Sequence, residues 1–339
     1  MMQALRRTFL AAVLLTPYTG ELPAGFMDGA ENRYDPGPPR NLVPPGARSH
    51  VVLLGSGMPL PNPYRFGPAT AVIVNGTPYI VDAGEGIWRA LGRASALHGG
   101  KVAAAFVPNR LTRLFITHQH ADHTIGIPAF LMMPWYMGRT KSVEIWGPKG
   151  IVHTVNAIQD AFSIDVNERI RIQIPPEKGV GYRATAHDLD IETSAIVYED
   201  DNVKVEAFHH HHVGLKHAFA YRFTTPDRII VIGGDGTADE RLVAAAQDAD
   251  VFIMEVATEA DLANAPWGGN SLAKKEKVMW AYHIKPRELA EIATKAQVRL
   301  LVLYHVQNYS DPFDGEALLK EIRQFYRGDV VQGRDSDIY

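Results

Sequence analysis

The chain has 339 residues, of which 46% are hydrophobic, so it can bury one large core or two smaller ones. Its formal net charge of −4 argues against nucleic acid as a main partner, because binding a phosphate backbone requires a basic surface. The sequence contains no cysteine. Disulfides and thiolate zinc sites are therefore excluded, and any metal must be held by histidine and carboxylate side chains.

The first 20 residues have the pattern of an export signal. Arg6 and Arg7 precede an apolar stretch over residues 8–15, and residues 6–10 resemble the twin-arginine motif. The stretch is shorter than the about 20 apolar residues that a membrane helix needs, so no stable membrane span is expected. We therefore predict a signal peptide over residues 1–20 and a periplasmic or secreted protein. The alternative is a frayed N-terminal helix of a cytoplasmic protein.

Residues 21–48 are rich in proline and glycine and are predicted to form an extended linker, or a strap on the domain surface. From residue 50 onward, β-branched runs alternate with helical patterns, which indicates two sheets covered by helices. The predicted strands are 51–54, 69–74, 78–81, 113–116, 142–145, 203–208, 218–223, 228–232, 251–254 and 299–303. Helices are predicted to begin after Gly86, around Asp122, after Pro148, after Thr237, at Pro286 and after Gly315.

A dense group of potential metal ligands follows the predicted strand 113–116: His118, His120, Asp122 and His123. His118 and His120 are two residues apart and project to the same side of an extended segment. Asp122 and His123 lie where a helix is predicted to begin. One loop can thus offer two imidazoles to one metal, and a carboxylate with a third imidazole to another. The alternative is a capped helix with surface histidines, in which Asp122 is the N-cap.

Three more groups of polar residues follow other apolar strands, at positions where loops of one sheet edge converge. They are the histidine run 209–212, Asp235 in a glycine-rich turn after strand 228–232, and His305 after strand 299–303. Each of them alone is typical of an ordinary loop. Since the first loop cannot complete two metal sites by itself, these groups are the candidates for the remaining ligands.

Together these motifs resemble the metallo-β-lactamase fold superfamily, and in their details its ribonuclease Z and arylsulfatase-like branch. The resemblance is carried by H-x-H-x-D-H at 118–123, by Asp235 and His305, and by the segments 54–59, 67–70 and 81–86. It implies an α/β fold, a four-layer αββα sandwich of two mixed β-sheets flanked by helices. It also implies a hydrolase domain over residues 49–339, with two zinc ions at one sheet edge.

The resemblance also implies a role for each polar residue. The first zinc would be held by His118, His120 and His212, the second by Asp122, His123 and His305, with Asp235 bridging them. Within the histidine run His212 is favoured, and His210 and His211 remain alternatives. Zinc ions about 3.5–4 Å apart would share a hydroxide that attacks the substrate.

Further residues complete the predicted catalytic set. Glu255 and His283 resemble the branch's proton-relay pair and are predicted, with Asp122, to be catalytic; the alternative for the pair is structural support. Asp82 is expected to orient a ligand imidazole rather than to bind metal. His217 is expected to be structural.

Two features narrow the substrate. In ribonuclease Z proper, an arm that grips tRNA lies between the ligand histidine and the bridging aspartate, whereas here 22 residues separate His212 from Asp235 and are predicted to form a hairpin. The apolar segments 131–139 and 265–270 are predicted to line a pocket beside the metals. The alternative for 131–139 is a helix end packed in the core.

We therefore expect hydrolysis of a small ester with an apolar or aromatic group, either an aryl sulfate ester or a phosphodiester. The alternatives are a lactone or other carboxylic ester and a β-lactam; a tRNA 3′-processing endonuclease and a non-catalytic metal-binding module are less favoured. A flavin-linked di-iron enzyme is disfavoured because His120 is present and no flavin domain is appended. The oligomeric state is left open, with a homodimer as one option.

Overall fold

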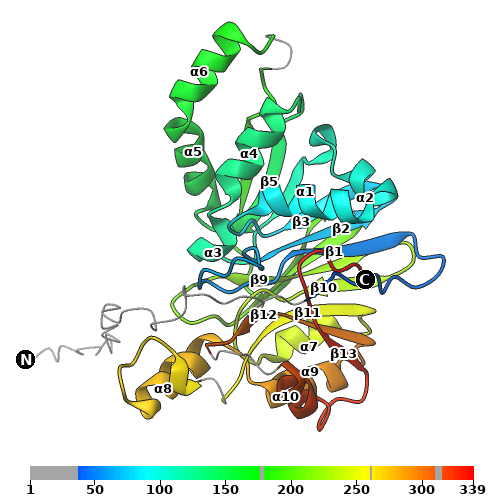
Figure 1. Ribbon diagram of the computed structural model, residues 1–339, viewed down its shortest axis with the longest axis vertical. Coiled ribbons are helices and arrows are strands. Elements are labelled where there is room, and N and C mark those ends of the chain that lie inside the picture. Colours follow the sequence, from blue (N-terminus) through cyan, green and yellow to red (C-terminus); the bar gives the residue numbers. More distant parts are fainter. Residues whose placement is uncertain (1–36, 176–178, 260–261, 310–314) are drawn as a thin grey trace, which may run out of the picture.

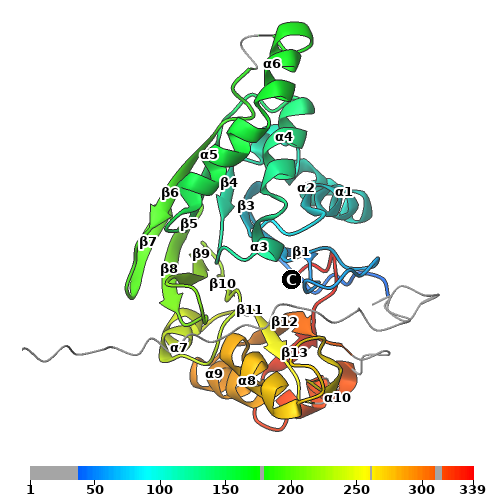
Figure 2. The same cartoon turned by 90° about the vertical axis from the view of Figure 1, so that its left-hand side faces the viewer.

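The computed structural model describes residues 37–175, 179–259, 262–309 and 315–339. Two β-sheets lie face to face, and helices cover the outer side of each sheet (Figures 1 and 2). The predicted αββα sandwich of two mixed sheets is therefore confirmed. The predicted signal peptide and residues 21–36 of the predicted linker lie outside the described residues.

The first sheet has six strands in the order β1-β2-β3-β4-β5-β6. β1 to β3 are antiparallel neighbours, and β3 to β6 run parallel. Strands such as β2 are buried on both faces, because helices cover one face and the second sheet covers the other. The strands are β1 (Ser49–Gly55), β2 (Ala69–Val74), β3 (Thr77–Val81), β4 (Arg113–Phe115), β5 (Val143–Pro148) and β6 (Ala184–Leu189).

The second sheet has seven strands in the order β13-β12-β11-β10-β9-β8-β7. β7 to β10 are antiparallel neighbours, and β10 to β13 run parallel. The strands are β7 (Ser194–Glu199), β8 (Lys204–His210), β9 (Ala218–Thr224), β10 (Ile229–Ile232), β11 (Val251–Ala257), β12 (Leu300–Gln307) and β13 (Asp329–Gln332).

The helices fall into two groups, one for each sheet (Figure 2). The first sheet carries α1 (Ile87–His98), α2 (Gly100–Ala105), the short α3 (Ala121–Thr124), α4 (Ile127–Tyr136), α5 (Ile151–Ala161) and the projecting α6 (Ser163–Ile172). The second carries α7 (Glu240–Ala246), α8 (Leu272–Tyr282), α9 (Pro286–Lys295) and α10 (Gly315–Ile322). Short 3-10 turns cover Pro108–Arg110 and Leu262–Asn264. None of the helices in the described ranges combines the length and apolar character that crossing a membrane requires.

Apolar side chains form one core layer at each of the three interfaces of the sandwich. Phe130 lies in the layer between the helices and the first sheet, and Leu289 in the equivalent layer of the second sheet. Between the sheets, the rings of Phe115 and Tyr221 meet edge to face with centroids 5.5 Å apart. The sheet edges that carry the polar loops are thereby held in a fixed relation to each other.

Residues 335–339 run beside β1 and fix the loop that follows it. The backbone N–H of Val51 donates to the carbonyl of Tyr339 at 2.9 Å. The buried carboxylate of Asp335 accepts the N–H of Ser56 at 2.8 Å and that of Phe66 at 2.6 Å. This anchoring positions the loop after β1 at the edge of the sandwich where the histidine loops meet.

Every predicted strand is present, but three strands were not predicted. β6 and β7 are half exposed and β13 has only four residues, so none shows a long apolar run. α8 was missed because only Lys275 and Met279 of it are buried. The prediction that β12 ends before His305 was wrong: pairing resumes with Val256 opposite Val306, so the strand continues to Gln307.

Candidate metal centre

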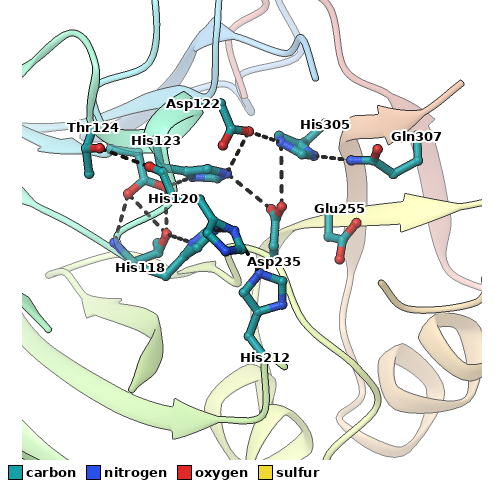
Figure 3. Close-up of polar contacts among 12 residues, drawn as sticks. His118, His120, Asp122, His123, Thr124, His212, Asp235, Glu255, His305 and Gln307 are labelled. Carbon is teal, nitrogen blue, oxygen red and sulfur yellow. Dashed lines mark hydrogen bonds and ion pairs between the residues drawn. The ribbon is translucent and has the colours of Figure 1, made fainter. Parts of the chain in front are cut away.

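The histidine loop leaves the end of β4 and enters α3 at the edge of the first sheet (Figure 3). His118 and His123 are fully buried, while His120 and Asp122 are partly exposed toward a pocket. The helical turn begins immediately after His120, which is extended. The loop therefore sends two imidazoles from its extended part, and a carboxylate and an imidazole from its helical turn, into one space.

His118, His120 and His212 bring three ring nitrogens together. The Nδ1 atom of His120 lies 3.1 Å from Nε2 of His118 and 3.1 Å from Nε2 of His212. Two nitrogens bound to a tetrahedral ion at about 2.0–2.1 Å are themselves about 3.3 Å apart, so this spacing fits one metal. Burial lowers the pKa of His118 well below its usual value and that of His212 to about 3. Both are therefore neutral, which is the state that binds metal.

Asp122, His123, His305 and Asp235 form a second group directly beside the first (Figure 3). The Nε2 atom of His305 lies 2.9 Å from Oδ2 of Asp122 and 3.5 Å from Oδ2 of Asp235. The Nε2 atom of His123 lies 3.6 Å from Oδ2 of Asp122 and 3.4 Å from Oδ1 of Asp235. Although burial opposes it, the adjacent His305 and His123 hold the pKa of Asp235 well below its usual range. The carboxylate is thus charged in the interior.

Two atoms of this second group are orphaned. Nε2 of His123 and Oδ1 of Asp235 are buried and have no hydrogen-bond partner within the described residues. Buried polar atoms are almost always paired, so an unpaired nitrogen beside an unpaired carboxylate oxygen fits a bound cation. Asp235 is also grouped with His118, so it faces both sets of ligands.

The turn that delivers Asp235 requires glycine. Gly234 has φ +67°, and a Cβ atom added there would lie 2.8 Å from Cβ of Thr117. A larger residue would push the end of β10 away from the histidine loop, and Asp235 with it.

The imidazoles that present Nε2 are held from behind through Nδ1. This contact fixes both the ring orientation and the tautomer. The partners of Nδ1 are Oδ2 of Asp82 at 2.8 Å for His123, Oγ1 of Thr117 at 3.0 Å for His118, the Tyr282 carbonyl at 3.1 Å for His212, and the Gln307 side chain at 2.9 Å for His305. Asp82 therefore lies where a residue that orients a ligand is expected.

Of the histidine run 209–212, only His212 points its ring into the cluster. His209 contacts the backbone carbonyls of Glu192 and Lys216. His211 is exposed, with Nδ1 3.1 Å from the Thr237 hydroxyl. His210 is buried with its ring against Gly236, and it belongs to none of the groups of potential ligands among the described residues. His217, expected to be structural, pairs with Asp190 at 2.9 Å, away from the cluster.

Glu255 and His283 form a pair next to Asp235. Glu255 lies on β11, and its fully buried carboxylate accepts from Nδ1 of His283 at 2.8 Å and from the backbone N–H of Gly236 at 3.0 Å. Burial raises the pKa of Glu255 and the adjacent His283 counteracts this. Because Nδ1 of His283 contacts Glu255, Nε2 is the ring nitrogen that can contact a molecule in the pocket that His283 lines.

A pocket of about 170 Å³ opens over the cluster. His120, Asp122, His212, Asp235 and His305 form its floor. Its apolar walls come from three places: Met58, Pro59 and Leu60 after β1, Trp267 and Tyr282 around α8, and Tyr309 after β12. The predicted contribution of segment 265–270 is confirmed for Trp267, whereas the other wall residues were not predicted.

The prediction that segment 131–139 lines the pocket was wrong. Leu131, Met132 and Trp135 are buried against the first sheet, and none of the segment's residues is among those that line the pocket. The cause is Arg139, whose buried guanidinium donates to the carbonyls of Leu111, Phe130, Leu131 and Gly181. Phe130 and Leu131 lie in the middle of α4, where Pro134 has no N–H to donate to the Phe130 carbonyl. The guanidinium satisfies these carbonyls and holds the segment in the core.

Comparison with known proteins agrees with this geometry. The Beta-lactamase superfamily domain matches residues 77–306. A ribonuclease Z from Mycobacterium sp. (strain KMS) is 30% identical over 263 residues, which cover 75% of this chain and 83% of the relative. The crystal structure of human tRNase Z, short form, superposes with a TM-score of 0.60 at 21% identity, covering 86% of this chain and 98% of that one. The metallo-β-lactamase fold protein YhfI from Bacillus subtilis gives a TM-score of 0.62 at 14% identity, covering 86% and 98%.

Proposed function

The chain belongs to the metallo-β-lactamase superfamily and is a metal-dependent hydrolase of ester bonds, and we propose that it uses two zinc ions to cleave a small, singly charged ester. The proposed substrate is a phosphodiester or an aryl sulfate ester with an apolar group. The observation that carries the proposal is the convergence of imidazoles and two carboxylates around the orphaned Nε2 of His123 and Oδ1 of Asp235.

The donor set fits zinc. Imidazole nitrogens with carboxylate oxygens, in two adjoining groups, are the ligands of catalytic zinc sites that lack cysteine. In the proposal His118, His120 and His212 hold the first ion, Asp122, His123 and His305 hold the second, and Asp235 contacts both. When bound, such a pair of ions lowers the pKa of a shared water and polarises the ester.

Charge balance supports a singly charged substrate. The negative charges of Asp122 and Asp235 offset only part of the positive charge of two Zn²⁺ ions, because the remaining ligands are imidazoles. The net charge of the centre is therefore positive. A phosphodiester and a sulfate ester each carry one negative charge at neutral pH. Neither lysine nor arginine is among the described residues that line the pocket, so nothing there favours a polyanion.

The pair Glu255–His283 supplies the proton that the leaving oxygen needs. Because Nδ1 contacts Glu255 at 2.8 Å, Nε2 is the ring atom that would transfer a proton to a substrate in the pocket that His283 lines. The buried carboxylate stabilises the imidazolium in the way that an aspartate orients a catalytic histidine. In the proposal His283 is the general acid and Glu255 orients it.

Pocket size supports a small substrate. The cavity of about 170 Å³ is narrowed by Trp267, Tyr282 and Tyr309. Between His212 and Asp235, β9 and β10 form a direct antiparallel hairpin, and its strands belong to the second sheet rather than to a projecting arm. The similarity to ribonuclease Z keeps tRNA 3′ processing as the second candidate function.

A screen of the zinc-loaded protein separates these candidates. We expect cleavage of bis(p-nitrophenyl) phosphate or p-nitrophenyl sulfate, and slower cleavage of a lactone, a β-lactam and a precursor tRNA. Asp235→Ala is the matched inactive control. A kcat/KM for precursor tRNA far above that of the small esters would overturn the substrate proposal in favour of the second candidate.

We also propose export, on the basis of Arg6-Arg7 and the apolar stretch that follows. In this proposal residues 1–20 are removed, residues 21–48 precede the hydrolase domain, and that domain spans residues 49–339. N-terminal sequencing of the protein recovered from the periplasm or medium of its host tests it, and a full-length chain found only in the cytoplasm would contradict it.

A further inference from the structure

The side chain of Gln307 connects a candidate metal ligand with the pocket wall. Gln307 is 2% exposed, and its carboxamide nitrogen lies 2.9 Å from Nδ1 of His305 (Figure 3). Its oxygen accepts from the hydroxyl of Tyr309 at 2.7 Å. Tyr309 lines the pocket and meets Trp267 edge to face, with ring centroids 4.9 Å apart. One buried amide thus lies between the ligand and the aromatic wall.

His305 lies at an irregular position in β12, where ordinary strand pairing does not set the direction of its side chain. Between Leu303 and Val306 the register of β12 against β11 gains one residue, which is a β-bulge. His305 lies in this bulge with φ +45°, a left-handed conformation that is strained for a residue other than glycine. Its N–H is satisfied by the carbonyl of Ser56 at 2.9 Å. The orientation of the imidazole ring therefore depends on the group that contacts its Nδ1 atom.

The orientation of the carboxamide depends on the state of the imidazole. An imidazole that offers the lone pair of Nε2 to a metal must carry its hydrogen on Nδ1, and that hydrogen needs an acceptor. His123 and His212 have such acceptors in the Asp82 carboxylate and the Tyr282 carbonyl. Gln307 can act as an acceptor only through its oxygen.

A half-turn of the carboxamide exchanges its oxygen and nitrogen while both contacts are kept. The terminal atom that faces Nδ1 therefore follows from the position of the imidazole hydrogen. For an imidazole with its hydrogen on Nδ1, the amide oxygen faces His305 and the amide nitrogen donates to the Tyr309 hydroxyl oxygen.

We propose that Gln307 is a positioning residue for His305: its carboxamide oxygen accepts the Nδ1 hydrogen of the imidazole that holds the second metal, and its nitrogen donates to the Tyr309 hydroxyl. This inference rests on the metal site of the proposed function and is independent of the substrate. It predicts that replacing Gln307 alters both the binding of the second ion and the contact with Tyr309 in the pocket wall.

Metal affinity tests the proposal without any activity measurement. The metal-free protein is titrated with zinc against a chromophoric chelator, and with Co²⁺ while its visible absorption is recorded. Gln307→Met, which has similar volume but neither donor nor acceptor, should weaken the second ion by about 10–100-fold and leave the first unchanged. Gln307→Glu, which offers only acceptors, should bind the second ion at least as tightly as the wild type. Gln159→Met, which removes a glutamine bonded to the Ala184 backbone, is the control and should change neither ion.

The possible results of these titrations distinguish the role of Gln307 from the metal centre and from the proposed substrate. Equal affinity of Gln307→Met and the wild type for the second ion, with identical Co²⁺ spectra, would overturn the role of Gln307. So would equal weakening by Gln307→Glu and Gln307→Met, or loss of both ions in Gln307→Met. If the wild type itself fails to bind two ions, the metal centre is overturned together with this inference. If it binds two ions but hydrolyses no ester, only the proposed substrate chemistry fails.

Discussion

The Oδ2 atom of Asp82 lies 2.8 Å from Nδ1 of His123, and the same carboxylate accepts the backbone N–H of Thr117 at 2.8 Å through Oδ1. Asp82 therefore holds both a ligand ring and the first residue of the loop that supplies the ligands. Asp82 is 1% exposed and directly follows β3 with φ +61°. Its carboxylate is therefore held inside the protein at the end of the strand.

Replacing Asp82 by asparagine should weaken the ion at His123. The amide keeps the size of the side chain and tolerates the left-handed backbone, but it removes the charge that keeps the Nδ1 hydrogen of His123 in place. We expect the affinity for that ion to fall by about 10–100-fold in a chelator competition. Asp188→Asn is the matched control and should bind as the wild type does: Asp188 lies in β6, and its carboxylate accepts the N–H groups of Gly150 and Val152 at the start of α5. Equal affinities in the two variants would contradict the role of Asp82.

Removing the proton donor should lower turnover without removing metal. Glu255→Gln and His283→Ala should each reduce kcat by about 10²–10⁴-fold for an ester with a poor leaving group, since general acid catalysis contributes on that scale. The loss should be smaller for a p-nitrophenyl ester, whose leaving group needs no proton. Zinc content is measured on the same samples. An equal loss for good and poor leaving groups would argue for a purely structural pair.

Trp267 should determine KM, and the α4 segment should not. Trp267→Ala removes an aromatic wall of the pocket, and we expect KM for an aryl ester to rise about tenfold, which corresponds to about 1.4 kcal/mol. Met133→Ala, on the exposed face of α4 outside the pocket, should leave KM unchanged. Steady-state kinetics on both variants decide the matter, and the reverse pattern would restore the original prediction for segment 131–139.

Zinc uptake should release protons and strengthen as pH rises. Burial opposes the charged form of His123, but Asp235, Asp122 and Asp82 raise its pKa well above the usual value, and the pKa of His305 is also raised. In the metal-free protein the ring of His123 holds a proton at neutral pH, and a metal must displace it. Because the protonated form competes, affinity should increase between about pH 6 and pH 8. Calorimetry in two buffers of different ionisation enthalpy counts the protons, and affinity that is constant over this range would contradict the pKa directions.

The residues that could be predicted from the sequence were those with a local signature. His118 to His123 form a dense motif, and Asp235 follows an apolar strand, so a resemblance could place them. Gln307 and Tyr309 have no such signature, and the motif that contains Met58 does not indicate that its side chain lines the pocket. The roles of these residues depend on which loops meet at the sheet edge. Segment 131–139 was misplaced because its apolar pattern fits a pocket as well as a core, and only the bonds of Arg139 to distant carbonyls distinguish the two.

The strands likewise differ in whether they could be predicted from a local pattern. Buried strands were predicted because both of their faces are apolar, whereas the half-exposed β6 and β7 carry no comparable run. The bulge at His305 could not be predicted from a sequence pattern, because it is a property of the register between β11 and β12.

The proposed function requires these side chains to hold two metal ions that perform ester hydrolysis. Elemental analysis of the purified protein and of Asp235→Ala, with the rate of bis(p-nitrophenyl) phosphate or p-nitrophenyl sulfate hydrolysis measured on the same samples, tests it most directly. We expect two zinc ions per chain with hydrolysis in the wild type, and loss of both the second ion and activity in Asp235→Ala. Iron in place of zinc, or hydrolysis that survives in Asp235→Ala, would contradict it.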